Sequence, residues 1–91
     1  MGKYREIDLS RVIQIDVHRN CIELLEEPIG FGFNTMMKVS ISEMRWEPKK
    51  VIINGCLVFK TTAAKSLYGA FREQMLGKIG QRDYRTVRIT K

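Results

Sequence analysis

Apolar and polar side chains alternate near the start of the chain. Over residues 9–17 four apolar residues share one parity, with Gln14 and Asp16 between them: Leu9, Ile13, Ile15 and Val17. This period, rich in β-branched residues, predicts a strand that turns at 18–20 and returns over 21–26. A helix over 10–27 is the alternative, because apolar residues also recur there at helical spacing and Pro28 would end it. We favour the strands, since β-branched side chains lose rotamer freedom in a helix.

A second extended region is predicted to open at Gly30-Phe31-Gly32-Phe33. Its alternating apolar positions are Met37, Val39 and Ile41. Met44 and Trp46 then fall on the opposite parity, which indicates a bulge or bend near Glu43.

The strongest local signal is a turn at Asn54-Gly55. A type I′ turn needs positive φ at both central residues, which Asn and Gly accept best. The flanking segments 51–53 and 56–59 are β-branched, aromatic or otherwise apolar, so the sequence predicts a hairpin. Both arms are apolar at consecutive positions, as in strands that are covered on both faces.

A helix is predicted directly after this hairpin, over about residues 62–79. One stripe of apolar residues recurs every three or four positions: Ala64, Leu67, Tyr68, Phe71, Met75 and Ile79. Thr61 or Thr62 would cap its start, and Gly77 or Gly80 its end. Residues 84–91 alternate again and predict a short edge strand or an extended arm.

These elements predict an α+β fold in one domain, residues 1–91. We expect an antiparallel sheet of about five strands with the 62–79 helix packed on one face. No apolar run reaches the ~20 residues that span a bilayer, and the charged N-terminus does not resemble a signal peptide. A cytoplasmic protein without membrane contact is therefore expected. Cys21 and Cys56 are expected as small buried thiols, with a Cys21–Cys56 bridge or one redox-active thiol as the alternative.

Charge is distributed unevenly along the chain. Residues 1–29 hold four basic and six acidic side chains, whereas residues 30–91 hold twelve basic and four acidic ones. The excess is greatest near the C-terminus, where Asp83 alone opposes four cations: Arg82, Arg85, Arg88 and Lys91. A localised positive surface attracts polyanions through counterion release. These cations could equally protect a strand edge from aggregation, and the two roles are compatible.

Two aromatic segments could add base stacking to this charge. Trp46 lies among Arg45, Lys49 and Lys50, which suggests a stacking platform in a basic groove, although a partly buried packing role is the simpler interpretation. Phe31 and Phe33 could stack on bases or could face the core.

Gly30-Phe31-Gly32-Phe33 matches the centre of the RNP1 motif of RNA-recognition domains. The chain departs from that motif at Ile29, Asn34 and Met36, and 29 preceding residues leave little room for the strand and helix that come before it. We do not assign the chain to that family.

No complete catalytic or metal motif is present. His18 is the only histidine, and neither Glu26-Glu27 nor the glycines of 30–33 form a known acid–base or phosphate-binding pattern. The sequence thus predicts a non-enzymatic protein without metal, cofactor or small-molecule substrate. The leading hypothesis is binding of single-stranded DNA or RNA. The alternative is a protein–protein adaptor or inhibitor that binds an acidic partner and self-associates through strand edges, for example as a homodimer.

Overall fold

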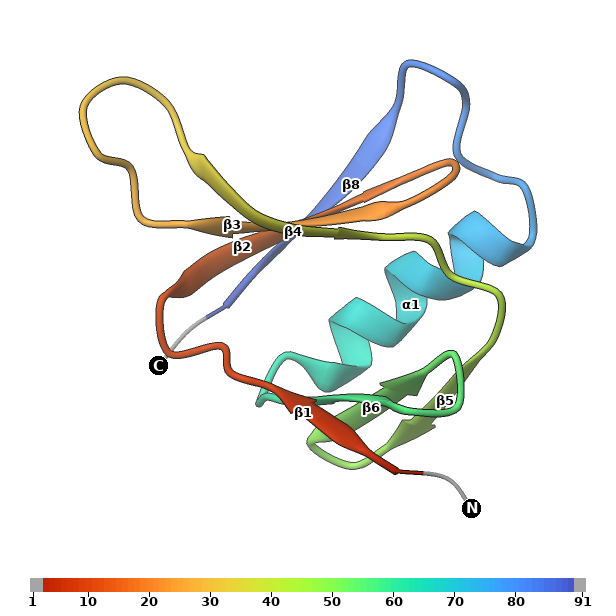
Figure 1. The fold of residues 1–91 in the computed structure, drawn as a ribbon. Coiled ribbons are helices and arrows are strands. Elements are labelled where there is room, and N and C mark those ends of the chain that lie inside the picture. Colours follow the sequence, from red (N-terminus) through yellow and green to blue (C-terminus); the bar gives the residue numbers. More distant parts are fainter. Residues whose placement is uncertain (1–2, 90–91) are drawn as a thin grey trace.

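The computed structural model describes residues 3–89, which form two four-stranded sheets with one helix between them (Figure 1). The first sheet has the order β1-β7-β6-β5 and consists of Arg5–Ile7, Leu57–Lys60, Lys50–Ile53 and Met44–Glu47. The second has the order β4-β3-β2-β8 and consists of Asn34–Val39, Ile22–Glu26, Val12–His18 and Tyr84–Arg88. Helix α1 spans Ala64–Met75 and contacts β5 and β6 of the first sheet and β2 and β8 of the second.

The α+β class is confirmed, but the single sheet of about five strands is wrong. The described residues form eight strands, and the chain crosses from the second sheet to the first between β4 and β5. The change of parity near Glu43 marks this crossing, not a bulge within one strand. Two sheets bury both sides of a short helix, which one sheet cannot do.

The two strands and turn predicted over residues 9–26 are confirmed, and the helical alternative is wrong. Strands β2 and β3 pair antiparallel, with Ile15 opposite Leu24 and Val17 opposite Ile22. These four side chains are fully buried on the face that packs toward the helix. Strand β4 begins at Asn34, so the predicted extended region at 30–33 is instead a loop.

The turn at Asn54-Gly55 has positive φ at both residues, 54° and 71°, as a type I′ turn requires. It joins β6 and β7, whose apolar residues are buried on both faces, as predicted. Ile52 and Val58 lie opposite each other on the face away from the helix and are still only 5% and 6% exposed.

Strand β1 was not predicted from the sequence. Its three residues pair parallel with β7, with Arg5 opposite Leu57. A strand this short and this charged carries no alternating pattern, so only the tertiary structure reveals it.

The helix is shorter than predicted. It begins at Ala64, with Ala63 rather than a threonine at the N-cap; the Thr61 hydroxyl accepts a hydrogen bond from the Ala63 N–H at 3.1 Å. Gly77, at φ 71°, ends it in a Schellman motif in which the Lys78 N–H donates to the Glu73 carbonyl at 2.9 Å.

The core lies where the helix meets the sheets. Leu67 and Phe71 are fully buried, and the Phe71 ring meets that of Phe59 edge-on, with centroids 6.4 Å apart. Burying one such side chain stabilises the fold by about 1.5–3 kcal/mol. Both cysteines are free and half-buried, Cys21 in the β2–β3 turn and Cys56 in the β6–β7 turn, so they do not form a bridge. Within residues 3–89, no helix has the length and apolar character needed to cross a membrane.

Candidate nucleic-acid interface

An exposed tryptophan stacked on a half-buried tyrosine lies at the edge of the first sheet. Trp46 on β5 stacks on Tyr68 of α1, with ring centroids 5.8 Å apart and planes inclined by 27°. Trp46 remains 43% exposed because β5 is an edge strand, so no further strand covers it. The indole thus packs between β5 and α1, and part of its surface remains exposed to solvent.

The pairing of β5 explains why Trp46 faces the helix. Trp46 lies opposite Val51, which is buried in the core, whereas Arg45 lies opposite Ile52 on the other face of the sheet. Successive side chains of a strand point to opposite faces. Residues adjacent in the sequence are therefore separated by the thickness of the sheet.

Cations flank the aromatic pair on the helix. Lys65 and Arg72 lie three residues before and four after Tyr68, so all three share one side of α1. Both cations are exposed, and neither forms an ion pair with any described residue. Their charge is therefore available to a ligand.

Lys49 lies in the turn that follows β5. It is exposed, has a φ of 61°, and its carbonyl accepts a hydrogen bond from the Thr61 N–H at 3.0 Å, which fixes the turn beside the start of the helix. We call the surface formed by Trp46, Lys65, Tyr68 and Arg72 the Trp46 ridge.

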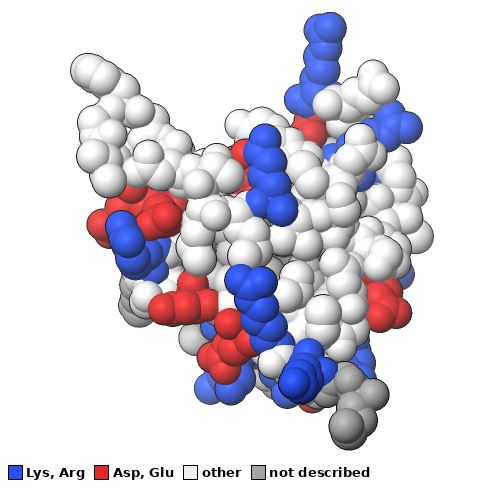
Figure 2. All heavy atoms as spheres, in the orientation of Figure 1, with Lys and Arg blue, Asp and Glu red and all other residues white. Residues whose placement is uncertain are grey.

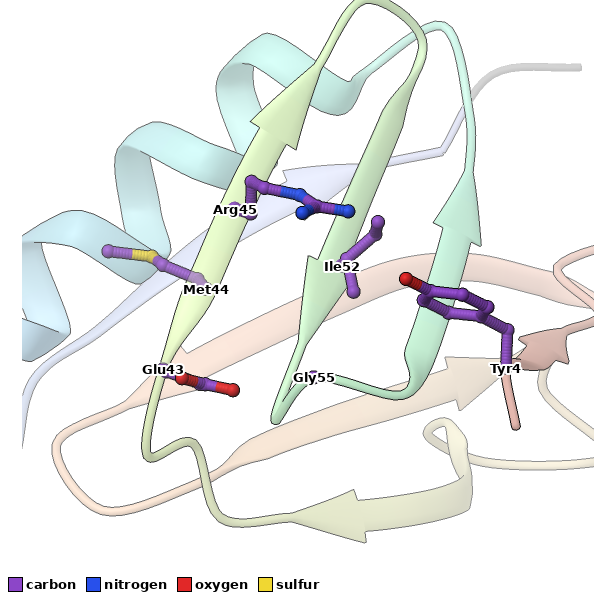
Figure 3. A pocket seen from close by; sticks show the side chains of 6 residues that line it. All are labelled: Tyr4, Glu43, Met44, Arg45, Ile52 and Gly55. Atoms are coloured by element: carbon purple, nitrogen blue, oxygen red, sulfur yellow. The ribbon is translucent and has the colours of Figure 1, made fainter. Parts of the chain in front are cut away.

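Arg45 and Lys50 do not join the ridge. Figure 3 shows Arg45 and Tyr4 reaching toward each other over Ile52, whereas Met44 points the opposite way. Glu47 pairs with both cations, at 3.6 Å from Arg45 and 3.7 Å from Lys50. The predicted groove of Trp46 among three cations therefore does not form, because Arg45 and Lys50 lie on the other face of the sheet from the indole and pair with Glu47.

The cations near the C-terminus are also separated. Arg82 is exposed in the loop before β8, and Arg88 is exposed on the face of the second sheet away from the helix. Arg85 points the other way, and its Nε lies 2.8 Å from Glu73 Oε2. That ion pair links β8 to α1. Lys91 lies outside the described residues.

Phe31 and Phe33 are not in the core. Both are exposed in the loop between β3 and β4, on the second sheet and away from the ridge. Figure 1 shows this loop projecting from the fold at the upper left, with the first sheet at the bottom.

Charge alone does not identify a binding face. In the view of Figure 2, Lys and Arg side chains stand singly, and over the lower part of the molecule acidic side chains lie between them. The ridge differs because two free cations flank a stacked aromatic pair. Sequence reasoning missed Tyr68, Lys65 and Arg72, although their spacing could have placed the two cations beside Tyr68.

Comparison of the chain with protein-family models, curated proteins and solved structures finds no match.

Proposed function

We propose that this chain is a small, non-enzymatic protein that binds single-stranded DNA or RNA at the Trp46 ridge. One observation carries the proposal: a half-exposed indole, stacked on Tyr68, lies beside cations that have no carboxylate partner among residues 3–89. An aromatic face and free positive charge are the two elements that a single strand requires.

The ridge offers a base and its phosphate separate contacts. A base that stacks on the exposed part of Trp46 would gain about 1–3 kcal/mol, whatever its identity. Lys65 and Arg72 would then neutralise phosphates on either side. A duplex is a poorer ligand, because its bases are already stacked on one another and expose only their edges in the grooves.

The test uses Trp46 as its own reporter, since it is the only tryptophan in the chain. Oligo(dT) and oligo(U) of about 15 nucleotides, enough for one small domain, are titrated at about 50 mM and about 200 mM salt. We expect quenching of the indole fluorescence and an affinity that falls as salt rises. No binding at the lower salt, or binding that does not change with salt, contradicts the proposal and favours a protein-binding adaptor.

A substitution separates stacking from simple packing. Trp46→Ala should weaken binding by about 5–150-fold, read by anisotropy of a labelled oligonucleotide. Tyr4→Ala removes another exposed aromatic ring from a different face and should leave affinity unchanged. If Trp46→Ala lowers the melting temperature but leaves the affinity of the folded protein intact, the indole only packs.

A further inference from the structure

The loop between β3 and β4 exposes an unusual amount of apolar surface. Ile29 is 78% exposed, Phe31 is fully exposed, and Phe33 is close to half-exposed. Gly30 and Gly32 have φ of 81° and 79°, a conformation that turns the chain sharply on both sides of Phe31. We call residues 27–33 the finger.

The base of the finger is ordered and acidic. The Asn34 side-chain amide donates a hydrogen bond to the Glu27 carbonyl at 3.2 Å, where β3 and β4 finish pairing. Glu26 pairs with Arg11 at 3.1 Å, and the exposed Glu27 carries a charge without an ion-pair partner among the described residues. The finger therefore presents an apolar tip on a carboxylate base.

A complementary hollow lies on the face of the first sheet that points away from α1. It measures about 450 Å³, within the range of about 300–1,000 Å³ typical of sites for small organic groups. The exposed ring of Tyr4 gives it an apolar wall, and the nearly buried side chains of Ile52 and Val58 lie at its floor. Arg45, Lys50 and Lys60 stand at its rim, with Glu47 near the first two and Glu6 3.3 Å from Lys60.

We propose that the finger of one copy inserts Phe31 into this hollow of a second copy. The apolar tip would meet the apolar wall and floor, and Glu27 would approach a rim that holds three cations against two carboxylates. Exposed aromatic side chains that fill a pocket are typical anchors of protein interfaces. The same chain supplies both halves of this contact.

The placement of the two surfaces determines the kind of assembly. Figure 1 shows the finger at the upper left, above the second sheet, whereas the outer face of the first sheet lies at the bottom. A chain cannot fill its own hollow, and two different patches meet at each contact. Such head-to-tail contacts form open chains or rings.

Two other uses of the finger are disfavoured by its surroundings. The exposed Glu27 at its base repels phosphates, so bases are poor ligands for Phe31 and Phe33. Two copies could also pair through their β4 edge strands. A bulge opposes this: the register between β3 and β4 shifts between Leu24 and Leu25, which leaves Met36 without a partner on β3 and makes the β4 edge irregular.

Sedimentation velocity at protein concentrations from about 5 to 500 μM detects self-association with dissociation constants in that range. We expect a weight-average mass that rises with concentration, and at least about a tenfold weaker association for Phe31→Ser. Leu76→Ser also removes an exposed apolar side chain, at the end of α1, and should associate like the natural chain. A monomer throughout the range, or association that Phe31→Ser leaves unchanged, overturns the proposal.

A mixing experiment identifies the contact as head-to-tail. Phe31→Ser keeps its hollow, and Arg45→Glu keeps its finger while it reverses one charge at the rim. Each variant alone should associate at least about tenfold more weakly than the natural chain, whereas the mixture should form a 1:1 dimer and stop there, because only one productive contact remains. A mixture that stays monomeric overturns the proposal. A protein that stays monomeric but sediments with phosphatidylcholine vesicles, and loses this when Phe31 is replaced, also overturns it. The finger would then be a lipid-binding element.

Discussion

The side-chain oxygen of Asn54 accepts hydrogen bonds from both the backbone N–H and the hydroxyl of Ser42, at 2.8 and 3.0 Å. The side-chain amide of Asn54 donates to the Ser40 carbonyl at 2.8 Å. Ser40 and Ser42 belong to the segment that crosses from the second sheet to the first. One side chain in a hairpin turn thus fixes the connection between the two sheets.

Asn54→Gly should destabilise the protein by about 1–3 kcal/mol. Glycine keeps the positive φ of the turn, so the loss measures the three side-chain hydrogen bonds rather than backbone strain. Urea unfolding followed by circular dichroism gives the free energy. Ser42→Ala should cost less, because the backbone N–H of residue 42 remains bound to Asn54. An equal stability of Asn54→Gly and the natural chain would show that this link contributes nothing.

Gly55→Val should cost more than about 1 kcal/mol, because a β-branched residue is strained at a φ of 71°. A Cβ atom at this position would also lie 2.9 Å from Glu43 Oε1. The melting temperature measures the effect. Gly69→Ala is the matched control: it lies within α1, its Cβ meets no atom within 4 Å, and it should stabilise by about 0.5–1 kcal/mol.

Gln74→Met should destabilise by about 1–3 kcal/mol, although methionine is similar in size. The side-chain amide of this buried residue donates to the carbonyls of His18 at 2.7 Å and Cys21 at 3.2 Å, so the substitution removes the donor that these carbonyls share. Hydrogen exchange of the β2–β3 turn should speed up more than exchange of the β6–β7 turn. Uniform exchange in both turns would argue against a local role.

The double variant Lys65→Gln/Arg72→Gln should reduce the slope of log affinity against log salt for single strands. The expected change is about 1.4, since each phosphate contact contributes about 0.7. Lys38→Gln/Arg88→Gln removes the same charge from the outer face of the second sheet and should leave the slope nearly unchanged. If both double variants change it equally, the protein binds through its overall charge rather than through the ridge.

Local sequence predicted the elements whose causes are local. The conformational needs of Asn54-Gly55 specify a turn in any context, and Leu67 and Phe71 mark the buried face of the helix by their spacing alone. The end of the helix at Met75 was harder to predict. Ile79 continues the apolar spacing, although Gly77 already ends the helix.

Relationships between distant segments could not be read in the same way. A change of parity at Glu43 has the same appearance whether a strand bulges or the chain moves to another sheet. Tyr68 fits an apolar helical stripe, and only the placement of β5 beside α1 makes it the support for Trp46. The exposure of Phe31 likewise depends on a loop that no other element covers.

The strand order also bears on how the chain folds. Strands β2, β3 and β4 follow one another in sequence and pair in that order, and so do β5, β6 and β7. Strands β1 and β8 instead pair with partners more than half the chain away, as Arg5 with Leu57 and Ile15 with Val87. Closing such long loops costs more chain entropy and slows folding. We therefore expect two meanders to form early, and the outer strands β1 and β8 to join them only once most of the polypeptide has been synthesised.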